Sequence, residues 1–174
     1  MAGAIGAKKV DVTWATEESG LLLALSVKSI NWRDARTKNF QKNVTNRRGD
    51  LLYEAMTLHR RFPYAVIGGF VFLDKEARND ATQKRRNTFL NTHSRLRLFD
   101  GRDVPAGREE QFERLYIVLL DANPFKAWWE VYRVGRPEEP ISLSDAFTDL
   151  VGLVAERNPD FYDVDVDGNL IKSQ

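Results

Sequence analysis

Apolar and polar positions along the chain predict strands and helices that alternate. Residues 8–14, KKVDVTW, alternate in polarity and are rich in β-branched side chains, which predicts a strand. A polar turn separates them from the apolar run 21–30, LLLALSVKSI, which predicts a buried second strand. Residues 64–74, YAVIGGFVFLD, are apolar on both faces, as in a central strand, and Gly68 and Gly69 there indicate a bulge or close packing.

Helices follow from the longer periodic patterns. In residues 46–62 the apolar residues lie four, three and four apart, which predicts an amphipathic helix that ends before Pro63. Residues 142–159 predict a second helix, with Ser142 or Ser144 as its N-cap. The remaining segments predict a mostly helical region at 75–99 and strands at 112–121 and 127–135.

Interspersed strands and helices predict an α/β fold, with a central mixed β-sheet flanked by helices on both faces. At 174 residues and 43% hydrophobic content, residues 1–174 are expected to form one domain. The absence of cysteine excludes a disulfide framework, a thiolate zinc site and a cysteine nucleophile. Two histidines, His59 and His93, argue against a histidine-centred hydrolase or metal site, and His59 is expected at the surface or half-buried.

The net charge is only +1, but each sign of charge is concentrated in a different part of the chain. Basic residues dominate 28–48 and 84–97, whereas acidic residues dominate 138–167. A protein that binds a polyanion on one side has such asymmetry, although two solvated surfaces would have it too. No apolar run approaches the roughly 20 residues that span a bilayer. A cytoplasmic location without a membrane partner is therefore expected.

Lys28 ends the second apolar strand, where a charged side chain needs an explanation. Since strand residues two apart share a face, Ser26 and Lys28 are expected on one face with Leu22 and Ala24. A hairpin between the first two strands would bring Asp11 to the same cleft. A carboxylate can hold Mg²⁺, which activates a bound water, while an ammonium orients that water or neutralises a developing oxyanion. The alternative is an ordinary cross-strand ion pair between Asp11 and Lys28.

The order of these elements resembles the PD-(D/E)XK nuclease superfamily, which has the restriction-endonuclease-like fold. The matching segments are VDVTW with Asp11, LLLALSVKS with Lys28, the helix DLLYEAMTLHRRF and the strand YAVIGGFVFLD, all within residues 8–74. The resemblance implies a restriction-type endonuclease that hydrolyses phosphodiester bonds of DNA with Mg²⁺, or with Mn²⁺ in its place. DNA is then the partner, and a homodimer is an option because members that cut both strands often dimerise.

One position departs from the superfamily motif. The second acidic position is Ser26 here, so the chain resembles a degenerate SxK variant. In members with that serine, a glutamate from the following helix supplies the missing carboxylate. Glu54 and Asp50 lie four apart on the predicted helix, and Glu54 is favoured because it adjoins the apolar stripe. Glu17 or Glu18 in the turn is a weaker candidate, and a solvated helix residue is the alternative interpretation of Glu54.

The resemblance also implies a role for each candidate residue. Asp11, the Val27 carbonyl and Glu54 would hold the metal ion. Lys28 would position the attacking water, and Ser26 would bond a water or a phosphate. The basic residues that follow the strand would hold the phosphate backbone of DNA: Arg33, Arg36, Lys38, Lys42, Arg47 and Arg48.

Two other functions stay open. A catalytically degenerate member would bind nucleic acid without cutting it, and an unrelated α/β interaction module would use Asp11 and Lys28 only as an ion pair. Glu54 at the shared cleft would favour the enzyme, whereas Glu54 in solvent would favour the binder. Superfamily members usually carry a helix before the aspartate strand, so either the chain is part of a longer protein or it does without that helix.

Two further motifs have competing interpretations. Residues 163–169, DVDVDGN, have the spacing of a calcium-loop start, but Gln174 stands where the bidentate glutamate is needed, so a small hairpin is favoured. Trp128 and Trp129 are neighbours in a predicted strand, so one is expected in the core and one on the surface. Stacking on bases is the alternative for these two side chains.

Overall fold

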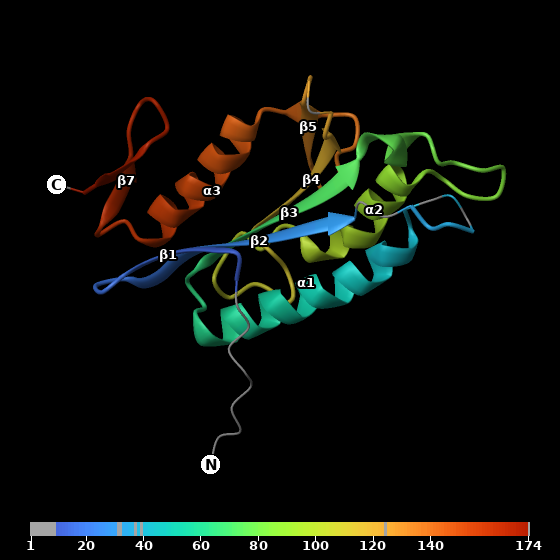
Figure 1. Ribbon diagram of the computed structural model, residues 1–174. Coiled ribbons are helices and arrows are strands. Elements are labelled where there is room, and N and C mark those ends of the chain that lie inside the picture. Colours follow the sequence, from blue (N-terminus) through green and yellow to red (C-terminus); the bar gives the residue numbers. More distant parts are fainter. Residues whose placement is uncertain (1–9, 31–32, 37, 39, 124, 174) are drawn as a thin grey trace, which may run out of the picture.

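A six-stranded mixed β-sheet is the centre of the fold (Figure 1). The computed structural model describes residues 10–30, 33–36, 38, 40–123 and 125–173, and at Lys42 the backbone alone. The strands follow one another in the sheet in chain order: β1 (Val12–Thr16), β2 (Gly20–Ile30), β3 (Val66–Asp74), β4 (Arg114–Asp121), β5 (Trp128–Arg133) and β6 (Pro140–Ile141). Strands β2, β3 and β4 are parallel, while β1, β5 and β6 each run antiparallel to their neighbours.

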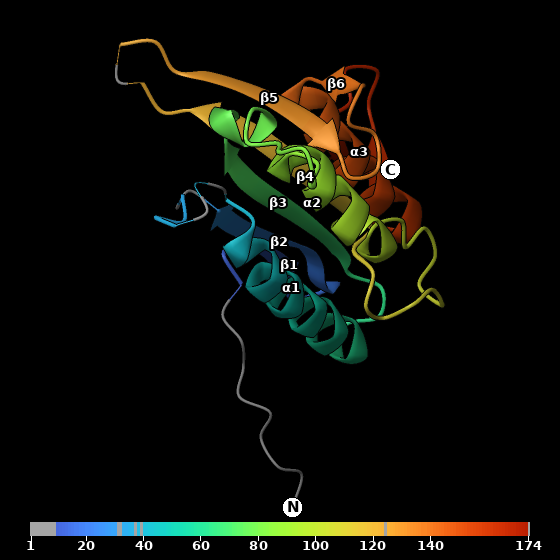
Figure 2. The same cartoon turned by 90° about the vertical axis from the view of Figure 1, so that its right-hand side faces the viewer.

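Three α-helices and a small hairpin complete the described chain. The helices are α1 (Lys42–Arg61), α2 (Thr88–Leu96) and α3 (Leu143–Arg157), with the 3₁₀ turns η1 (Lys75–Arg78) and η2 (Arg97–Phe99) and the hairpin β7 (Tyr162–Val164) and β8 (Leu170–Lys172). In Figures 1 and 2, α1 and α2 lie on one side of the sheet and α3 on the other. The predicted α/β class with a mixed sheet is confirmed. No helix of the described residues is long and apolar enough to cross a membrane.

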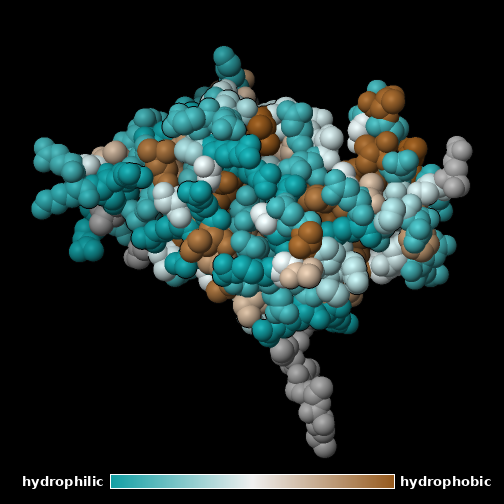
Figure 3. All heavy atoms as spheres, turned by 180° about the vertical axis from the view of Figure 1, so that it is seen from behind, coloured by the Kyte–Doolittle hydropathy of each residue, from teal (hydrophilic) through white to brown (hydrophobic). Residues whose placement is uncertain are grey.

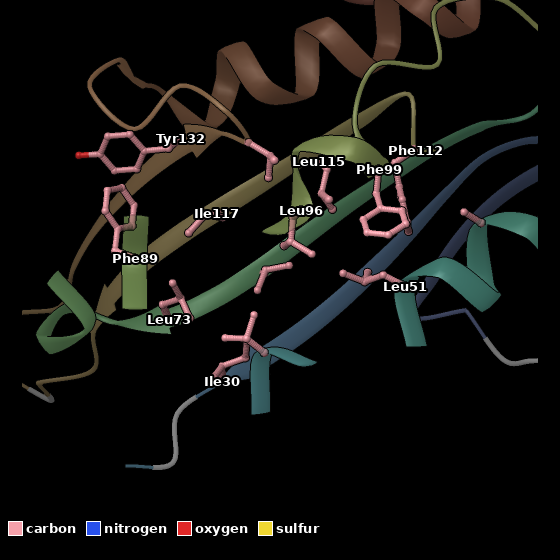
Figure 4. Packing of buried hydrophobic residues seen from close by; sticks show 14 of the residues in the cluster. Ile30, Leu51, Leu73, Phe89, Leu96, Phe99, Phe112, Leu115, Ile117 and Tyr132 are labelled. Atoms are coloured by element: carbon pink, nitrogen blue, oxygen red, sulfur yellow. The ribbon is translucent and has the colours of Figure 1, made fainter. Parts of the chain in front are cut away.

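Strand β3 separates two apolar clusters because its side chains alternate. Ile67, Val71 and Leu73 belong to the cluster that contains residues of α1 and α2 (Figure 4). Val66 and Phe70 belong to the cluster that contains residues of α3. A strand that is buried on both faces reads as a continuous apolar run, which is why β3 was recognisable as central.

The two glycines of β3 serve close packing and not a bulge, because its register with both neighbours is continuous. A Cβ atom at Gly68 would lie 2.8 Å from Leu25 Cδ2, and one at Gly69 would lie 2.5 Å from Leu115 Cδ1. Both distances are shorter than any ordinary contact between carbon atoms. A side chain at either position would have to displace a neighbouring leucine, so glycine permits this close packing.

The irregularity lies in the hairpin of β1 and β2. Trp14 pairs with Leu23 and Ala15 pairs with Leu21, so Leu22 is an extra residue in β2. Leu22 consequently joins the cluster beside α3 and does not share a face with Ala24, as the alternation alone predicted. Beyond this bulge the expected alternation holds, and it carries Ser26 and Lys28 to the side of α1.

Several element boundaries differ from the predictions. β1 begins at Val12, so Asp11 precedes the strand, and the first residues of the predicted segment 8–14 lie outside the described residues. Helix α1 begins at Lys42, a turn earlier than predicted. The predicted helical region 75–99 is interrupted, and its only α-helix is α2.

The interruption before α2 has a clear cause. The buried carboxylate of Asp80 accepts hydrogen bonds from the Thr88 amide at 2.6 Å, from the Thr88 hydroxyl and from the Phe40 amide at 3.2 Å. Thr82 and Arg85 pair as a short β-bridge in the intervening loop. Asp80 thus holds the chain in a loop before α2 and fastens the segment that precedes α1.

The predictions for the C-terminal part are confirmed. Ser142 is the N-cap of α3 and forms a capping box with Asp145. Residues 163–169 form the end of β7 and the turn of the β7–β8 hairpin, with Gly168 at a positive φ of 80°. The hairpin interpretation of DVDVDGN is therefore correct.

Candidate active site

The β1–β2 hairpin brings Asp11 to the carboxyl end of β2. Val12 pairs with Leu25, so the chain places Asp11 beside Ser26 and Val27. Asp11 Oδ2 accepts a hydrogen bond from the Val27 amide at 2.7 Å and lies 3.6 Å from Lys28 Nζ. The pairing of β1 with β2 ends before Val27, and there the Asp11 carboxylate accepts the hydrogen bond of the Val27 amide. This hydrogen bond holds Asp11 against β2 although Asp11 precedes β1.

Helix α1 supplies the second carboxylate. Glu54 Oε1 lies 3.0 Å from Lys28 Nζ, and Glu54 Oε2 accepts a hydrogen bond from the Ser26 hydroxyl. Glu54 is only 4% exposed, because Leu51 and Ala55 on the same helix pack into the apolar cluster beside it. A buried carboxylate requires hydrogen bonds or an opposite charge, and Ser26 and Lys28 provide both.

Lys28 joins the two carboxylates. Its side chain is 13% exposed and contacts Asp11, which is 46% exposed, and Glu54, which is buried. The exposure of the three charged side chains therefore decreases from Asp11 through Lys28 to Glu54. Among the four residues that the resemblance singles out, Asp11, Ser26, Lys28 and Glu54, each contacts at least one of the others.

A pocket of about 350 Å³ opens at this cluster. Its lining consists of Val27, Lys28 and Ser29 from β2, and of Arg47, Asp50 and Glu54 from α1. Arg47 and Asp50 form an ion pair of 3.2 Å at the mouth. Asp50 was the alternative to Glu54. Of these two residues, Glu54 is the one whose carboxylate contacts Lys28 Nζ.

Ser29, a pocket residue that the sequence analysis did not single out, lies one position after the lysine. The strand alternation directs attention to Ser26 and Lys28, because they share one face. Ser29 lies on the other face of β2, where it is exposed, while Ile30 after it is buried. The signal that could have found Ser29 is its place at the strand end.

The basic residues divide into two groups. Arg33, Arg36 and Lys38 lie in the exposed segment after β2, where Arg33 Nε donates to the Lys38 carbonyl at 2.8 Å and Asp34 accepts from the Arg36 amide at 3.0 Å. Arg47 lines the pocket itself, whereas Arg48 places its guanidinium over the ring of Phe99, 5.1 Å away, outside the pocket lining. The side chain of Lys42 lies outside the described residues.

His59, expected at the surface or half-buried, is instead fully buried in a polar cluster away from the pocket. Its Nε2 lies 3.2 Å from Glu113 Oε2, and its Nδ1 lies 3.0 Å from the Glu109 carbonyl. Glu113 also pairs with Arg102 and Arg157, each at 2.7 Å. Burial alone would raise the pKa of Glu113, but the hydrogen bond and charge of His59, together with Arg157, lower it overall.

The two tryptophans of β5 also differ from the prediction. Both side chains are exposed, Trp128 at 36% and Trp129 at 54%. Neither lies in the core, because the segment of β5 that carries them extends past the part of the sheet that the helices cover. Their alternation puts them on opposite faces of that extension.

Comparisons with known protein families, with curated proteins and with solved structures give no match for this chain. The arrangement of Asp11, Ser26, Lys28 and Glu54 is therefore the basis on which a function can be argued.

Proposed function

We propose that this protein is a PD-(D/E)XK-type endonuclease of restriction-endonuclease-like fold that hydrolyses phosphodiester bonds of DNA with Mg²⁺. The observation that carries the proposal is the position of Glu54. It is buried at the shared cluster, bonded to Ser26 and Lys28, whereas a nucleic-acid binder without activity leaves this carboxylate free to face solvent. The helix carboxylate thus lies where the serine at the motif's second acidic position requires one.

The donors at the cluster fit a magnesium ion. The described residues contain no group of three or more acidic or histidine side chains arranged around one point. Mg²⁺ is commonly held by one or two carboxylates and keeps several waters, and Asp11 and Glu54 are such a pair. These two side chains, with the Val27 carbonyl, would hold Mg²⁺ or Mn²⁺, and the bound ion would supply a more acidic water and charge for the phosphate.

The remaining residues have roles that follow from their contacts. Lys28 keeps both carboxylates in place and presents its ammonium at the pocket, where it would orient a water or neutralise negative charge on the phosphate. Ser26 fixes the rotamer of Glu54. Arg33, Arg36 and Lys38 in the segment after β2, with Lys42 and Arg47 of α1, would hold the DNA backbone near the pocket.

Cleavage of supercoiled plasmid tests the proposal. Wild type is expected to nick or linearise DNA with Mg²⁺ or Mn²⁺ and not with EDTA. Asp11→Ala, Lys28→Ala and Glu54→Gln are each expected to lower the rate at least ~100-fold, since each removes a group that acts on the reacting atoms. Glu109→Gln is the matched control, because Glu109 forms an exposed ion pair with Arg60 far from the pocket. Equal rates in all variants would contradict the proposal.

A nucleic-acid binder without nuclease activity is the second candidate. It is favoured by a different observation: neither Asp11 nor Ser26 is among the residues that line the pocket. DNA binding that weakens steeply with salt and with Arg36→Ala, but without cleavage by wild type, would select this candidate. Absence of binding would leave the unrelated interaction module. A homodimer and a cytoplasmic location stay predictions.

A further inference from the structure

The hairpin that joins β4 and β5 carries an exposed aromatic tip. Phe125 is 97% exposed, and Trp128 and Trp129 follow it with large exposed fractions. The Phe125 amide donates to Asn123 Oδ1 at 2.9 Å, and the Lys126 amide donates to the Asn123 carbonyl at 3.2 Å. These hydrogen bonds form a turn in which the side chains of Phe125 and Lys126 are exposed. Single exposed apolar side chains are ordinary, but three large aromatic side chains exposed on one hairpin form a surface that can bind a partner.

The tip lies at the same edge of the sheet as the candidate active site. Strands β2, β3 and β4 are parallel, so their carboxyl ends meet at one edge. Figure 2 shows the hairpin projecting beyond the sheet on the side of the segment that follows β2. Lys28 is in register with Val71, and Val71 with Ile117. At ~3.3 Å per residue and ~4.8 Å between strands, Asp121 lies about 16 Å from Lys28, and Phe125 at most about 30 Å.

The aromatic side chains cover the hairpin on both faces and at its end. Trp128 pairs with Asp121 and lines a pocket with Lys75 and Arg78, on the side of α1 and α2. Trp129 shares the opposite face with Val131, which packs in the cluster beside α3. Lys75 and Arg78 adjoin Trp128, but each is already paired with a carboxylate, Asp121 at 2.6 Å and Glu130 at 2.8 Å. The flat, exposed rings themselves are the feature that suits nucleic-acid bases, whose π-faces stack on aromatic side chains.

We propose that the β4–β5 hairpin stacks on unpaired bases of the nucleic acid held at the candidate active site. This inference rests on the proposed function and narrows its substrate to DNA that has, or readily opens, an unpaired segment. At 3.4 Å per base pair, that segment would lie about 5 to 9 nucleotides from the reacting phosphate. Bases within a duplex are stacked on one another, so the rings gain contact only where the duplex is open.

Binding in EDTA, where no cleavage is expected, tests the inference. The probes are a 40-base-pair duplex and the same duplex with a central unpaired segment of roughly six nucleotides, a length chosen to exceed one stacking site. Phe125→Ala and Trp129→Ala are each expected to weaken binding of the open probe about 5- to 100-fold and to leave duplex binding unchanged. The matched control is Tyr64→Ala, because Tyr64 is an exposed aromatic residue, at 65% against 54% for Trp129, but precedes β3 at the opposite edge of the sheet. Tryptophan fluorescence of wild type should be quenched by the open probe and not by the duplex.

Each other outcome identifies what fails. Equal loss for both probes, or no loss, overturns the hairpin inference while plasmid cleavage still upholds the nuclease. A dimer of wild type that Phe125→Ala and Trp129→Ala dissociate, with unchanged preference for DNA, assigns the tip to contact with a second copy and also overturns it. If wild type binds neither probe and cuts no plasmid, the proposed function fails with it.

Discussion

At the scale of single residues, Ser26 explains how a carboxylate can be supplied from a helix. A serine in β2 is short enough to leave room for Glu54, and its hydroxyl donates to Glu54 Oε2. Lys28 then meets a carboxylate from each side, Asp11 from the β1 end and Glu54 from α1. The serine is thus a positioning residue for the buried glutamate.

Ser26→Ala tests that positioning role. The substitution leaves one oxygen of a buried carboxylate without its donor, so we expect the free energy of unfolding to fall by about 1–3 kcal/mol. Plasmid cleavage should fall too, while Ser26→Thr, which keeps a hydroxyl, should restore part of it. Ser94→Ala is the matched control, since the Ser94 hydroxyl is exposed on α2, donates to the Leu90 carbonyl and lies outside the pocket lining. A stability loss without any change in cleavage would contradict a positioning role.

His93 is expected to make stability depend on pH. Burial, with the charge of Arg78 as the second cause, lowers the pKa of His93 from 6.5 to about 4. Between these values the unfolded chain binds more protons at this residue than the folded chain. The contribution to stability is therefore complete above about pH 6.5 and is lost as the pH falls to about 4.

Urea unfolding between pH 4 and 7 measures this effect. His93→Gln should flatten the acid limb of the stability profile, by up to about 3 kcal/mol relative to wild type. The comparison must be a difference between the two proteins, because Asp100, whose pKa is raised by burial, titrates at acid pH as well. Parallel profiles would show that His93 becomes protonated without unfolding.

At the scale of elements, regular periodicity predicted most of the fold. The alternation and apolar content predicted β2, β3, β4 and β5, and the spacing of apolar residues predicted α1 and α3. Where the prediction failed, a contact distant in sequence decided the structure. Asp80 interrupts the helical region before α2 through hydrogen bonds to Thr88 and Phe40, and no local pattern announces it.

The glycines of β3 give a prediction on packing. Gly69→Ala places a Cβ atom 2.5 Å from Leu115 Cδ1 in a fully buried layer, so we expect a loss of about 1–3 kcal/mol in the free energy of unfolding. Gly152→Ala is the matched control. Gly152 lies within α3 with no atom near the added Cβ, so alanine there should stabilise the protein by roughly 0.5–1 kcal/mol through helix propensity. Thermal unfolding distinguishes the two signs.

At the scale of the whole molecule, a buried polar cluster holds distant segments together. Glu113, at the start of β4, contacts His59 of α1, Arg157 of α3 and Arg102 of the intervening loop. It also accepts a hydrogen bond from the Ile67 amide at 2.7 Å, in β3. One carboxylate thus connects the helices of both sides of the sheet at the amino ends of β3 and β4.

Glu113→Gln should be among the most damaging substitutions in the chain. It removes the only carboxylate that contacts Arg102 or Arg157 among the described residues, and both guanidinium groups are buried. We expect a loss of about 3–5 kcal/mol in the free energy of unfolding, because two buried charges lose their counter-ion. Chemical denaturation checks this. Glu110→Gln, at an exposed ion pair with Arg108, is the control and should change stability by less than about 1 kcal/mol.

The candidate site was more accessible to sequence reasoning than the buried cluster. Asp11 directly precedes β1, Ser26 and Lys28 lie in β2, and Glu54 lies in α1, so the hairpin, strand alternation and helix spacing relate them. Glu113 and its partners come from five separate segments, and their meeting depends on the completed sheet. The prediction that one of Trp128 and Trp129 lies in the core failed for the same reason. Whether a helix covers this part of β5 depends on segments that are distant in sequence.

The contiguity of the candidate site has a consequence for how such a protein can diversify. The four residues of the cluster, Asp11, Ser26, Lys28 and Glu54, all come from the part of the chain that ends within α1, and the later strands contribute none of them. Changes in the later part of the chain therefore leave the sequence of this stretch unaltered. The β4–β5 hairpin and the elements after it can be exchanged or lengthened, which would change the side chains that lie near the pocket and leave the four residues of the cluster in place.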